Sequence, residues 1–416
     1  MFPLSKDILT LITFYTDTEM KKTLTFTIAS LLALACFAET NHGNATENKS
    51  IEPEFPTEET HEPGFLGAPI NQAIERGMQR ADREMEYKYG RTVTDFATAP
   101  KVGGYYMSGY YYSSQEGAHN GDGFKQKNVR FYVSGSVFKH FNYLVQVQLA
   151  NAAFHMKDFW MEWKKYPEFS VKVGQFIRVF GFENPYNPFE YRDGAYALIT
   201  QKLAAQADYI GTDNGGGRDQ GIQVQGDLFP VGKDQHRLIH YQLMLSNGQT
   251  INASDANGKK DISGTFQLQP IKGFYLAFYG WTGDHKANNV TVNRNRYMIS
   301  AFYDVNEWTA RAEYAHSTGH KISDYNPITG EWSGAGEAQG WYATLGIPFN
   351  DWLKLWLKYD AYQDDACWSS TRSIYSISPN IQIHKNLWFQ PRVAYVHDRT
   401  LDTNWTEVSI ELGVRF

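Results

Sequence analysis

The sequence predicts an all-β protein, a transmembrane antiparallel β-barrel of about 16 strands preceded by a short N-terminal periplasmic helical segment. Three observations carry this prediction: segments of alternating apolar and polar residues recur from residue 102 onward, tight and long connections alternate between them, and the chain is both aromatic and hydrophilic. Because strand side chains alternate between two faces, one face can meet lipid while the other lines a wet interior.

The composition supports a barrel over a soluble domain. Aromatic residues make up 15% of the 416 residues, yet the mean hydropathy is −0.49. A soluble protein would bury so many rings in an apolar core, whereas a barrel spreads them in girdles at the two membrane interfaces and keeps a polar lumen. The formal net charge of −6 gives no basic excess for binding nucleic acid.

The N-terminal region has the order of a secretory signal. Lys21-Lys22 precede an apolar run from Leu24 to Ala38 that ends in small residues. The run is short for a transmembrane helix, which needs about 20 residues. We therefore interpret residues 1–38 as an upstream extension and signal peptide, with Met20 as the better start and cleavage after Ala38. Lipid modification of Cys36 is the alternative.

Residues 39–100 are interpreted as a linker followed by an amphipathic helix. The linker is rich in Glu, Thr, Asn and Pro up to about residue 68. From 69 to 90, apolar residues recur at spacings of three or four, which predicts a helix. This helix could be a periplasmic plug, an oligomerisation helix or a surface helix without a role of its own. After processing only Cys367 remains, so neither an intrachain disulfide nor a cysteine metal site is expected.

Residues 101–416 are interpreted as the barrel domain. The sixteen predicted strands span about 102–113, 127–138, 143–150, 156–164, 169–177, 218–228, 237–246, 260–269, 273–282, 293–304, 307–317, 339–348, 351–361, 371–383, 386–397 and 403–416. Connections after even strands are tight, except that the one after the sixth strand, Phe229 to His236, is slightly longer. Those after odd strands are mostly long: 114–126, 178–217, 247–259, 283–292, 318–338 and 362–370. Such sorting is expected when one rim faces the periplasm and the other faces outward.

The last strand shows the pattern most clearly. Val408, Ile410, Leu412, Val414 and Phe416 fall on one face, and Glu407, Ser409, Glu411, Gly413 and Arg415 fall on the other. We expect this strand to close the barrel against the first one. Inward charges of both signs elsewhere, such as Arg294, Arg296 and Glu313, fix which face points to the lumen, since an Arg or Lys facing lipid would cost about 2–4 kcal/mol. A barrel this wide holds water.

A motif begins the longest connection. Gly174, Gln175, Phe176, Phe180, Gly181 and Glu183, with the strand 131–137 and the terminal Phe416, resemble the phosphate-selective porin O and P family over about residues 100–416. The resemblance implies a sixteen-stranded, usually trimeric barrel with its third loop folded into the pore. It also implies that Phe416 is read by the outer-membrane assembly machinery. Ile177 and Val179 depart from the family pattern of Lys and Pro, which leaves the phosphate preference open.

Basic residues on the inward loop and the wall are the candidates for a pore constriction, because rings of Arg and Lys favour anions. The candidates are Arg178, Arg192 and Lys202 on the loop and Arg130, Lys172, Arg294, Arg296, Arg311 and Arg372 on the wall. The alternative is that most of them pair with Glu183, Glu190, Asp193, Glu307 or Glu313 and brace the loop. By our count, residues 101–416 hold about 30 basic and about 30 acidic residues, so there is no cationic excess.

The function expected from this sequence is a porin, a non-enzymatic channel for passive diffusion of small hydrophilic solutes, anions such as phosphate among them. Its partners would be outer-membrane lipid, those solutes, two further copies in a homotrimer and the assembly machinery. The alternatives are an adhesin or surface receptor barrel, or a barrel phospholipase, for which no Ser-His constellation can be assembled. No cofactor or metal is expected. Acidic loops at 255–261 and 213–219 lack the spacing of a calcium loop and are interpreted as ordinary turns.

Overall fold

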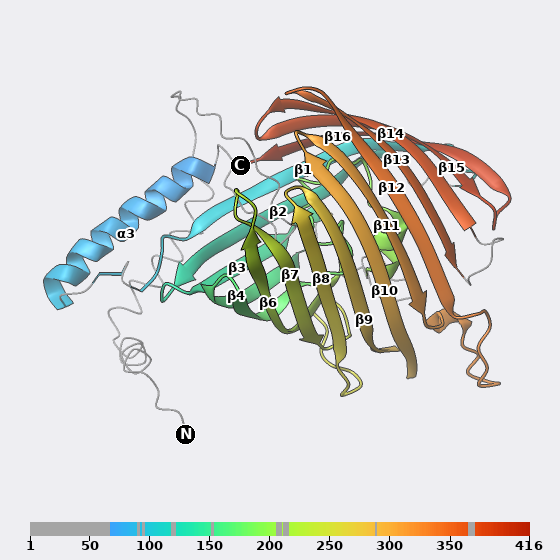
Figure 1. Ribbon diagram of the computed structural model, residues 1–416, viewed down its shortest axis with the longest axis horizontal. Helices are drawn as coiled ribbons and strands as arrows, with labels where there is room; N and C mark the ends of the chain where they lie inside the picture. Colours follow the sequence, from blue (N-terminus) through green and yellow to red (C-terminus); the bar gives the residue numbers. More distant parts are fainter. Residues whose placement is uncertain are drawn as a thin grey trace.

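The structure is a computed structural model that describes residues 67–89, 92–93, 96–117, 122–150, 154–204, 210, 216–287, 289–364 and 371–416. The predicted leader, most of the linker and both cysteines lie outside these residues. Figure 1 shows one sheet curled into a barrel, with helix α3 (Gly67–Tyr89) beside one of its ends. Two short helical segments, α4 (Leu198–Leu203) and η3 (Ile322–Asp324), belong to connections between strands.

Sixteen antiparallel strands form a closed barrel in chain order, which confirms the predicted fold class. They are β1 (Lys101–Ser113), β2 (Gly123–Val137), β3 (Phe141–Gln148), β4 (His155–Tyr166), β5 (Phe169–Ile177), β6 (Arg218–Val231), β7 (His236–Ser246), β8 (Asp261–Ile271), β9 (Phe274–Ala287), β10 (Val290–Val305), β11 (Trp308–Thr318), β12 (Glu337–Asn350), β13 (Leu353–Asp364), β14 (Thr371–His384), β15 (Leu387–Asp398) and β16 (Thr403–Arg415). The predicted closure is also confirmed, because β16 pairs with β1 from Tyr105↔Arg415 to Ser113↔Glu407.

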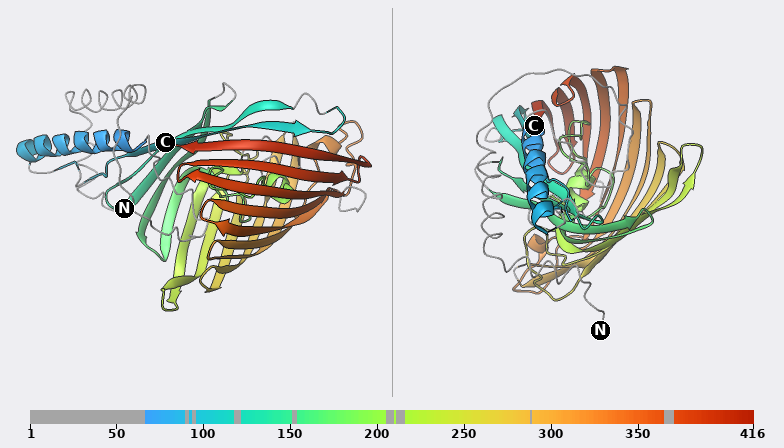
Figure 2. Two further views of the ribbon diagram at one scale, coloured as in Figure 1. Left: turned by 90° about the horizontal axis from the view of Figure 1, so that it is seen from above. Right: turned by 90° about the vertical axis from the view of Figure 1, so that its left-hand side faces the viewer.

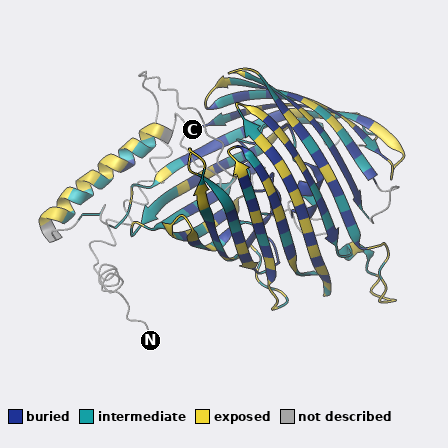
Figure 3. Cartoon of the chain, viewed as in Figure 1, coloured by how far each residue is buried: buried dark blue, intermediate teal, exposed yellow. Residues whose placement is uncertain are grey.

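The side chains of each strand alternate between the two sides of the wall (Figure 3). In β10, Arg294, Arg296 and Ser300 are buried on the inner side, whereas Tyr297 and Ile299 are exposed on the outer side. Exposed Ile, Leu, Val and Phe side chains recur on the outer faces of the other strands. An outer surface this apolar suits the hydrocarbon of a bilayer, and a closed barrel leaves no strand edge unpaired in it.

Aromatic residues mark two heights on the outer wall. Near the long loops, Trp341 contacts Tyr359 and Tyr359 contacts Tyr375, with ring centroids 4.8 and 4.9 Å apart. Near the tight turns, Phe131 contacts Phe416 at 5.2 Å. Transmembrane barrels carry aromatic girdles at both membrane interfaces, so rings at these two heights agree with a barrel that spans a bilayer.

Connection lengths follow the predicted sorting with one correction. The turns that join β2–β3, β8–β9, β10–β11 and β12–β13 are tight, and we call this end of the barrel the turn rim; the other end is the loop rim. The predicted long loop 283–292 at the loop rim was wrong. There, β9 and β10 continue as a paired ribbon from Asn293↔Asp284 to Val290↔Ala287. The alternation of apolar and polar residues did not reveal these paired positions. The ribbon extends beyond the apolar band of the barrel and carries polar residues such as Asp284 and Asn293.

Helix α3 lies beyond the turn rim and outside the barrel, so it does not plug the lumen (Figures 1 and 2). Its bounds confirm the predicted helix at 69–90. Asn71 fastens it to the start of β1: its Oδ1 accepts from the Val102 amide at 2.7 Å, and its Nδ2 donates to the Val102 carbonyl at 3.0 Å. Within the described residues, none of the helices combines the length and apolar character that crossing a membrane requires.

Candidate pore constriction

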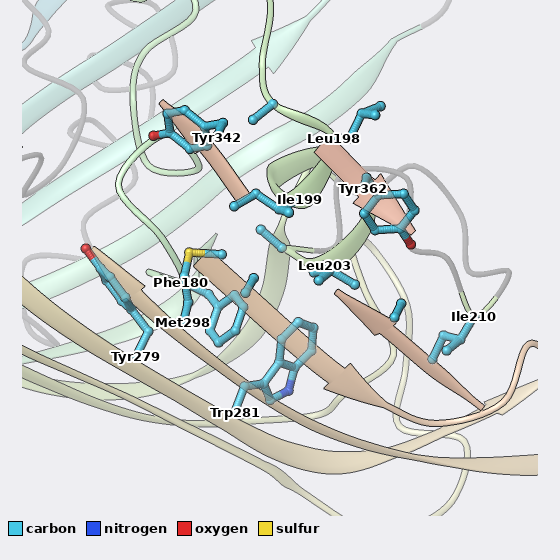
Figure 4. Packing of buried hydrophobic residues seen from close by; sticks show 14 of the residues in the cluster. Phe180, Leu198, Ile199, Leu203, Ile210, Tyr279, Trp281, Met298, Tyr342 and Tyr362 are labelled. Carbon is cyan, nitrogen blue, oxygen red and sulfur yellow. The ribbon is translucent and has the colours of Figure 1, made fainter. Parts of the chain in front are cut away.

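The connection between β5 and β6 lies inside the barrel. Figure 2, in the view along the barrel, shows this segment within the ring of strands. Its apolar residues are buried against the inner face of β9–β13, as Figure 4 shows for Phe180, Leu198, Ile199 and Leu203 beside Tyr279, Trp281, Met298, Tyr342 and Tyr362. Aromatic rings on an inner wall are unusual beside water, and here they provide the seat on which the loop packs.

The motif residues shape the point where the loop leaves β5. Gly174 has a φ of +135°, and a Cβ there would lie 2.2 Å from the Phe159 carbonyl oxygen. Gly181 has a φ of +86°, and a Cβ would lie 2.6 Å from Met298 Sδ. Only glycine adopts these conformations without strain and lets the backbone approach so closely. Gly174 therefore lets β5 lie close against β4 just before the loop begins, and Gly181 lets the loop lie against β10.

Glu183 is the organising group of the loop. Its fully buried carboxylate accepts hydrogen bonds from Tyr191 Oη at 2.5 Å, the Ala197 amide at 2.7 Å and Thr200 Oγ1 at 2.8 Å. Lys358 of β13 supplies the neutralising charge, with Nζ 2.5 Å from Glu183 Oε1. A buried carboxylate is tolerated when it is paired and hydrogen-bonded, and this one joins three parts of the loop to the wall.

Further buried ion pairs brace the loop and its surroundings. Arg178 binds Asp219 at 2.7 Å, Arg294 binds Asp261 at 2.7 Å and Arg311 binds Asp193 at 2.8 Å, and each of these side chains is at most 6% exposed. The guanidinium groups of Arg178, Arg294 and Arg296 also lie over the ring of Trp281, at 3.9, 4.6 and 4.6 Å. Arg178, Arg296 and Arg311 therefore hold the loop, with Arg296 donating to the Leu203 carbonyl, and Arg294 braces the wall beneath it. Of the carboxylates that the bracing alternative named, only Asp193 forms an ion pair with one of these four within the described residues.

The tip of the loop reaches a second part of the wall. Glu190 pairs with Arg415 of β16. Arg192 donates to Gln382 of β14 at 2.5 Å and lies over the ring of Trp388 of β15 at 5.1 Å. The loop thus spans from its seat on β9–β13 to β14–β16, which narrows the lumen between them.

Charged pairs on this second part of the wall differ from the bracing pairs because water reaches them. We call the set the charged wall; it consists of Lys127–Glu411, Arg372–Asp398, Arg392–Glu407 and the Glu190 carboxylate with Arg192 and Arg415. The side chains of Arg372 and Lys127 are 38% and 34% exposed, and those of Glu190 and Glu407 are each 35% exposed. Since they all point inward, the water they meet is that of the lumen.

The structure does not gather the nine predicted basic residues into one ring. Arg192 and Arg372 belong to the charged wall. Arg130 donates to Gln148 and Gln146 at 2.9 and 3.1 Å, and Lys172 lies over Trp160 at 4.5 Å; both are buried on the wall of β2 and β5. Lys202, in the last turn of α4, is partly exposed and makes no ion pair within the part of the chain that the structure describes.

Several members of the charged wall were not among the predicted candidates. Glu407, Glu411 and Arg415 carry a clear signal, because they form the polar face of the last strand. Arg392 occupies an inward position in β15 by the same alternation. Lys127 has no such signal, since the β1–β2 register shifts between Met107 and Ser108, and an irregularity of this kind breaks the strict period of two.

The loop at 255–261 is an ordinary turn held by its own groups. Asp255 Oδ1 accepts from the Asn257 and Gly258 amides at 3.0 and 2.8 Å, and the Lys260 ammonium binds its other oxygen. The Lys260 contact, with those amides, lowers the pKa of Asp255 below its usual range. Residues 211–215 of the other acidic loop lie outside the described residues.

The barrel is similar to several solved outer-membrane proteins. The anion-selective porin from Comamonas acidovorans matches with a TM-score of 0.60 at 12% identity, over 77% of this chain and 100% of that one. OmpT of Vibrio cholerae, in its trimer form, matches with a TM-score of 0.54 at 8% identity, over 77% and 100%. The outer membrane channel DcaP of Acinetobacter baumannii gives 0.51 at 10%, over 76% and 97%. At these identities the likeness is one of fold.

No protein-family model and no curated protein matches the chain. The resemblance to the phosphate-selective porin O and P family therefore stays a prediction, while the sixteen-stranded barrel shared with porins is established.

Proposed function

We propose that the protein is a porin of the outer membrane of a Gram-negative bacterium. It would form a water-filled channel through which small hydrophilic solutes, anions such as phosphate among them, diffuse passively. One observation carries the proposal: a loop braced inside the barrel narrows the lumen beside a wall of charged side chains that remain exposed to water. A constriction of this kind lets fixed charges act on a permeating ion at short range.

The proposal is tested by inserting the purified full-length protein into planar bilayers. We expect stepwise conductance in KCl, because the charged wall offers a hydrated path. The reversal potential across a KCl gradient, repeated with phosphate as the competing anion, then measures the preference for charge. A protein that folds and inserts but never conducts would contradict the proposal. A cation-selective reversal potential would remove the anion preference and leave the channel.

We also propose that the protein assembles as a homotrimer, in keeping with the trimer form of OmpT among the similar structures. Chemical cross-linking in isolated membranes and native mass measurement of the detergent complex test this. A mass of one chain plus detergent at all concentrations would exclude it.

A further inference from the structure

The charged wall presents both signs of charge to the same water. Each basic group already has a carboxylate beside it: Arg392 has Glu407 at 3.3 Å, and Arg192 has Glu190 at 3.8 Å. The exposure of Glu190 and Glu407 equals or exceeds that of the arginines they contact. A permeating anion therefore meets repelling carboxylates within a few ångströms of the arginines that attract it. A cation likewise meets repelling arginines beside the carboxylates that attract it.

The wall beside the tip of the loop also holds hydrogen-bond donors that are buried but unused by the described residues. Asn380 Nδ2, Trp388 Nε1 and Arg392 Nε each lack an acceptor among these residues, and their side chains are 6%, 0% and 9% exposed. They belong to β14 and β15, the strands that the tip of the loop reaches. Asn380 and Trp388 both contact Arg192, and a Cβ on Gly194 would lie 2.9 Å from Arg392 Cδ. A donor without an acceptor leaves the positive end of its N–H dipole unneutralised, so these three groups add to the positive potential around Arg192.

We infer that the solutes favoured by this passage are small zwitterions with the chemistry of amino acids, over simple anions of the same size. Their carboxylate would meet the guanidinium of Arg192, beside which Asn380 and Trp388 lie. Their ammonium would meet Glu190 or Glu407, the same groups that repel a plain anion. Because opposite charges are separated by only a few ångströms on both the solute and the wall, the two dipoles can align. The inference rests on the proposed channel function.

Three probes of nearly equal size test the inference in lipid vesicles that contain the full-length protein: glycine as a zwitterion, glycolate as an anion and glycolamide as a neutral molecule. Osmotic swelling rates report their entry. We expect glycine to enter about two- to fivefold faster than glycolate, the factor that one partly exposed ion pair is worth. Equal rates for the three probes, or faster entry of glycolate, would overturn the inference and leave the channel function standing. Absence of entry by any probe, together with absence of conductance, would overturn both.

Variants locate the effect. The double substitution Glu190→Gln and Glu407→Gln removes the exposed carboxylates and keeps the arginines, so we expect glycolate to overtake glycine. Arg192→Gln should slow both of them relative to glycolamide. Glu331→Gln, on the exposed loop between β11 and β12, is the matched control and should leave the order unchanged. If the double variant keeps the preference for glycine, the carboxylates are not its source and the inference fails.

Discussion

Replacing Glu183 with Leu should release the loop from the barrel wall and produce channels of larger, noisier conductance. The substitution leaves the Lys358 ammonium buried without its carboxylate and removes the acceptor of three loop donors. Loss of one partner of a buried ion pair costs about 3–5 kcal/mol. We therefore expect the free energy of unfolding, measured by urea titration in lipid vesicles, to fall by about that amount. Single-channel recordings report the width of the path.

Two variants make the result specific. The pair Glu183→Leu with Lys358→Met removes both charges, so much of the lost unfolding free energy should return. Glu331→Gln removes an exposed carboxylate on the connection between β11 and β12 and should change neither measurement. Unaltered conductance and unfolding in Glu183→Leu would show that this carboxylate does not hold the constriction.

Deleting Phe416 should lower the amount of assembled barrel more than it changes the conductance of the barrels that form. The residue closes the ladder at the turn rim, where its amide and carbonyl both pair with Gly104 at 3.0 Å, and its ring packs on Phe131. None of these contacts lies in the lumen. The fraction that resists unfolding in an unheated denaturing gel measures assembly, and planar bilayers measure conductance.

Comparing two settings separates the two possible roles of Phe416. If assembly fails in cells but folding of the purified chain into vesicles is normal, the residue acts as a signal for the assembly machinery. If both fail, its packing is required. Phe416→Leu keeps an apolar side chain and is the matched variant. Normal assembly of the deletion in both settings would show that neither role holds.

The strands could be predicted because their information is local. A wall between lipid and water imposes a period of two on each segment, and the pattern in 169–177 gave the bounds of β5 without error. The prediction failed for 283–292, where β9 and β10 leave the apolar band and polar residues occupy both faces. There the two strands are held by pairing with each other. Their two faces do not differ in polarity, because neither face meets lipid, so the sequence shows no alternation.

The constriction could be predicted only in part because its contacts join residues far apart in the chain. Glu183 meets Lys358 across 175 positions, and Arg311 meets Asp193 across 118. Composition indicates that charges of both signs line the lumen, but not which arginine pairs with a buried aspartate and which remains in water. The motif marked the connection that folds into the barrel. The final position of the loop is set by the aromatic side chains of β9–β13 on which it packs, and these residues are far from the loop in the sequence.

The path of the loop has a consequence for the order in which the molecule is built. Its tip pairs with Arg415, the last residue of β16, so the contact becomes available only after the last strand is in place. Until then Phe189 at the tip, which packs on Trp388 and lies under the Arg415 guanidinium, lacks part of its surroundings, and contacts this distant in sequence form slowly. Barrel closure and docking of the loop tip should therefore be one event, and an assembly halted before β16 joins β1 would leave this apolar tip exposed and prone to aggregation.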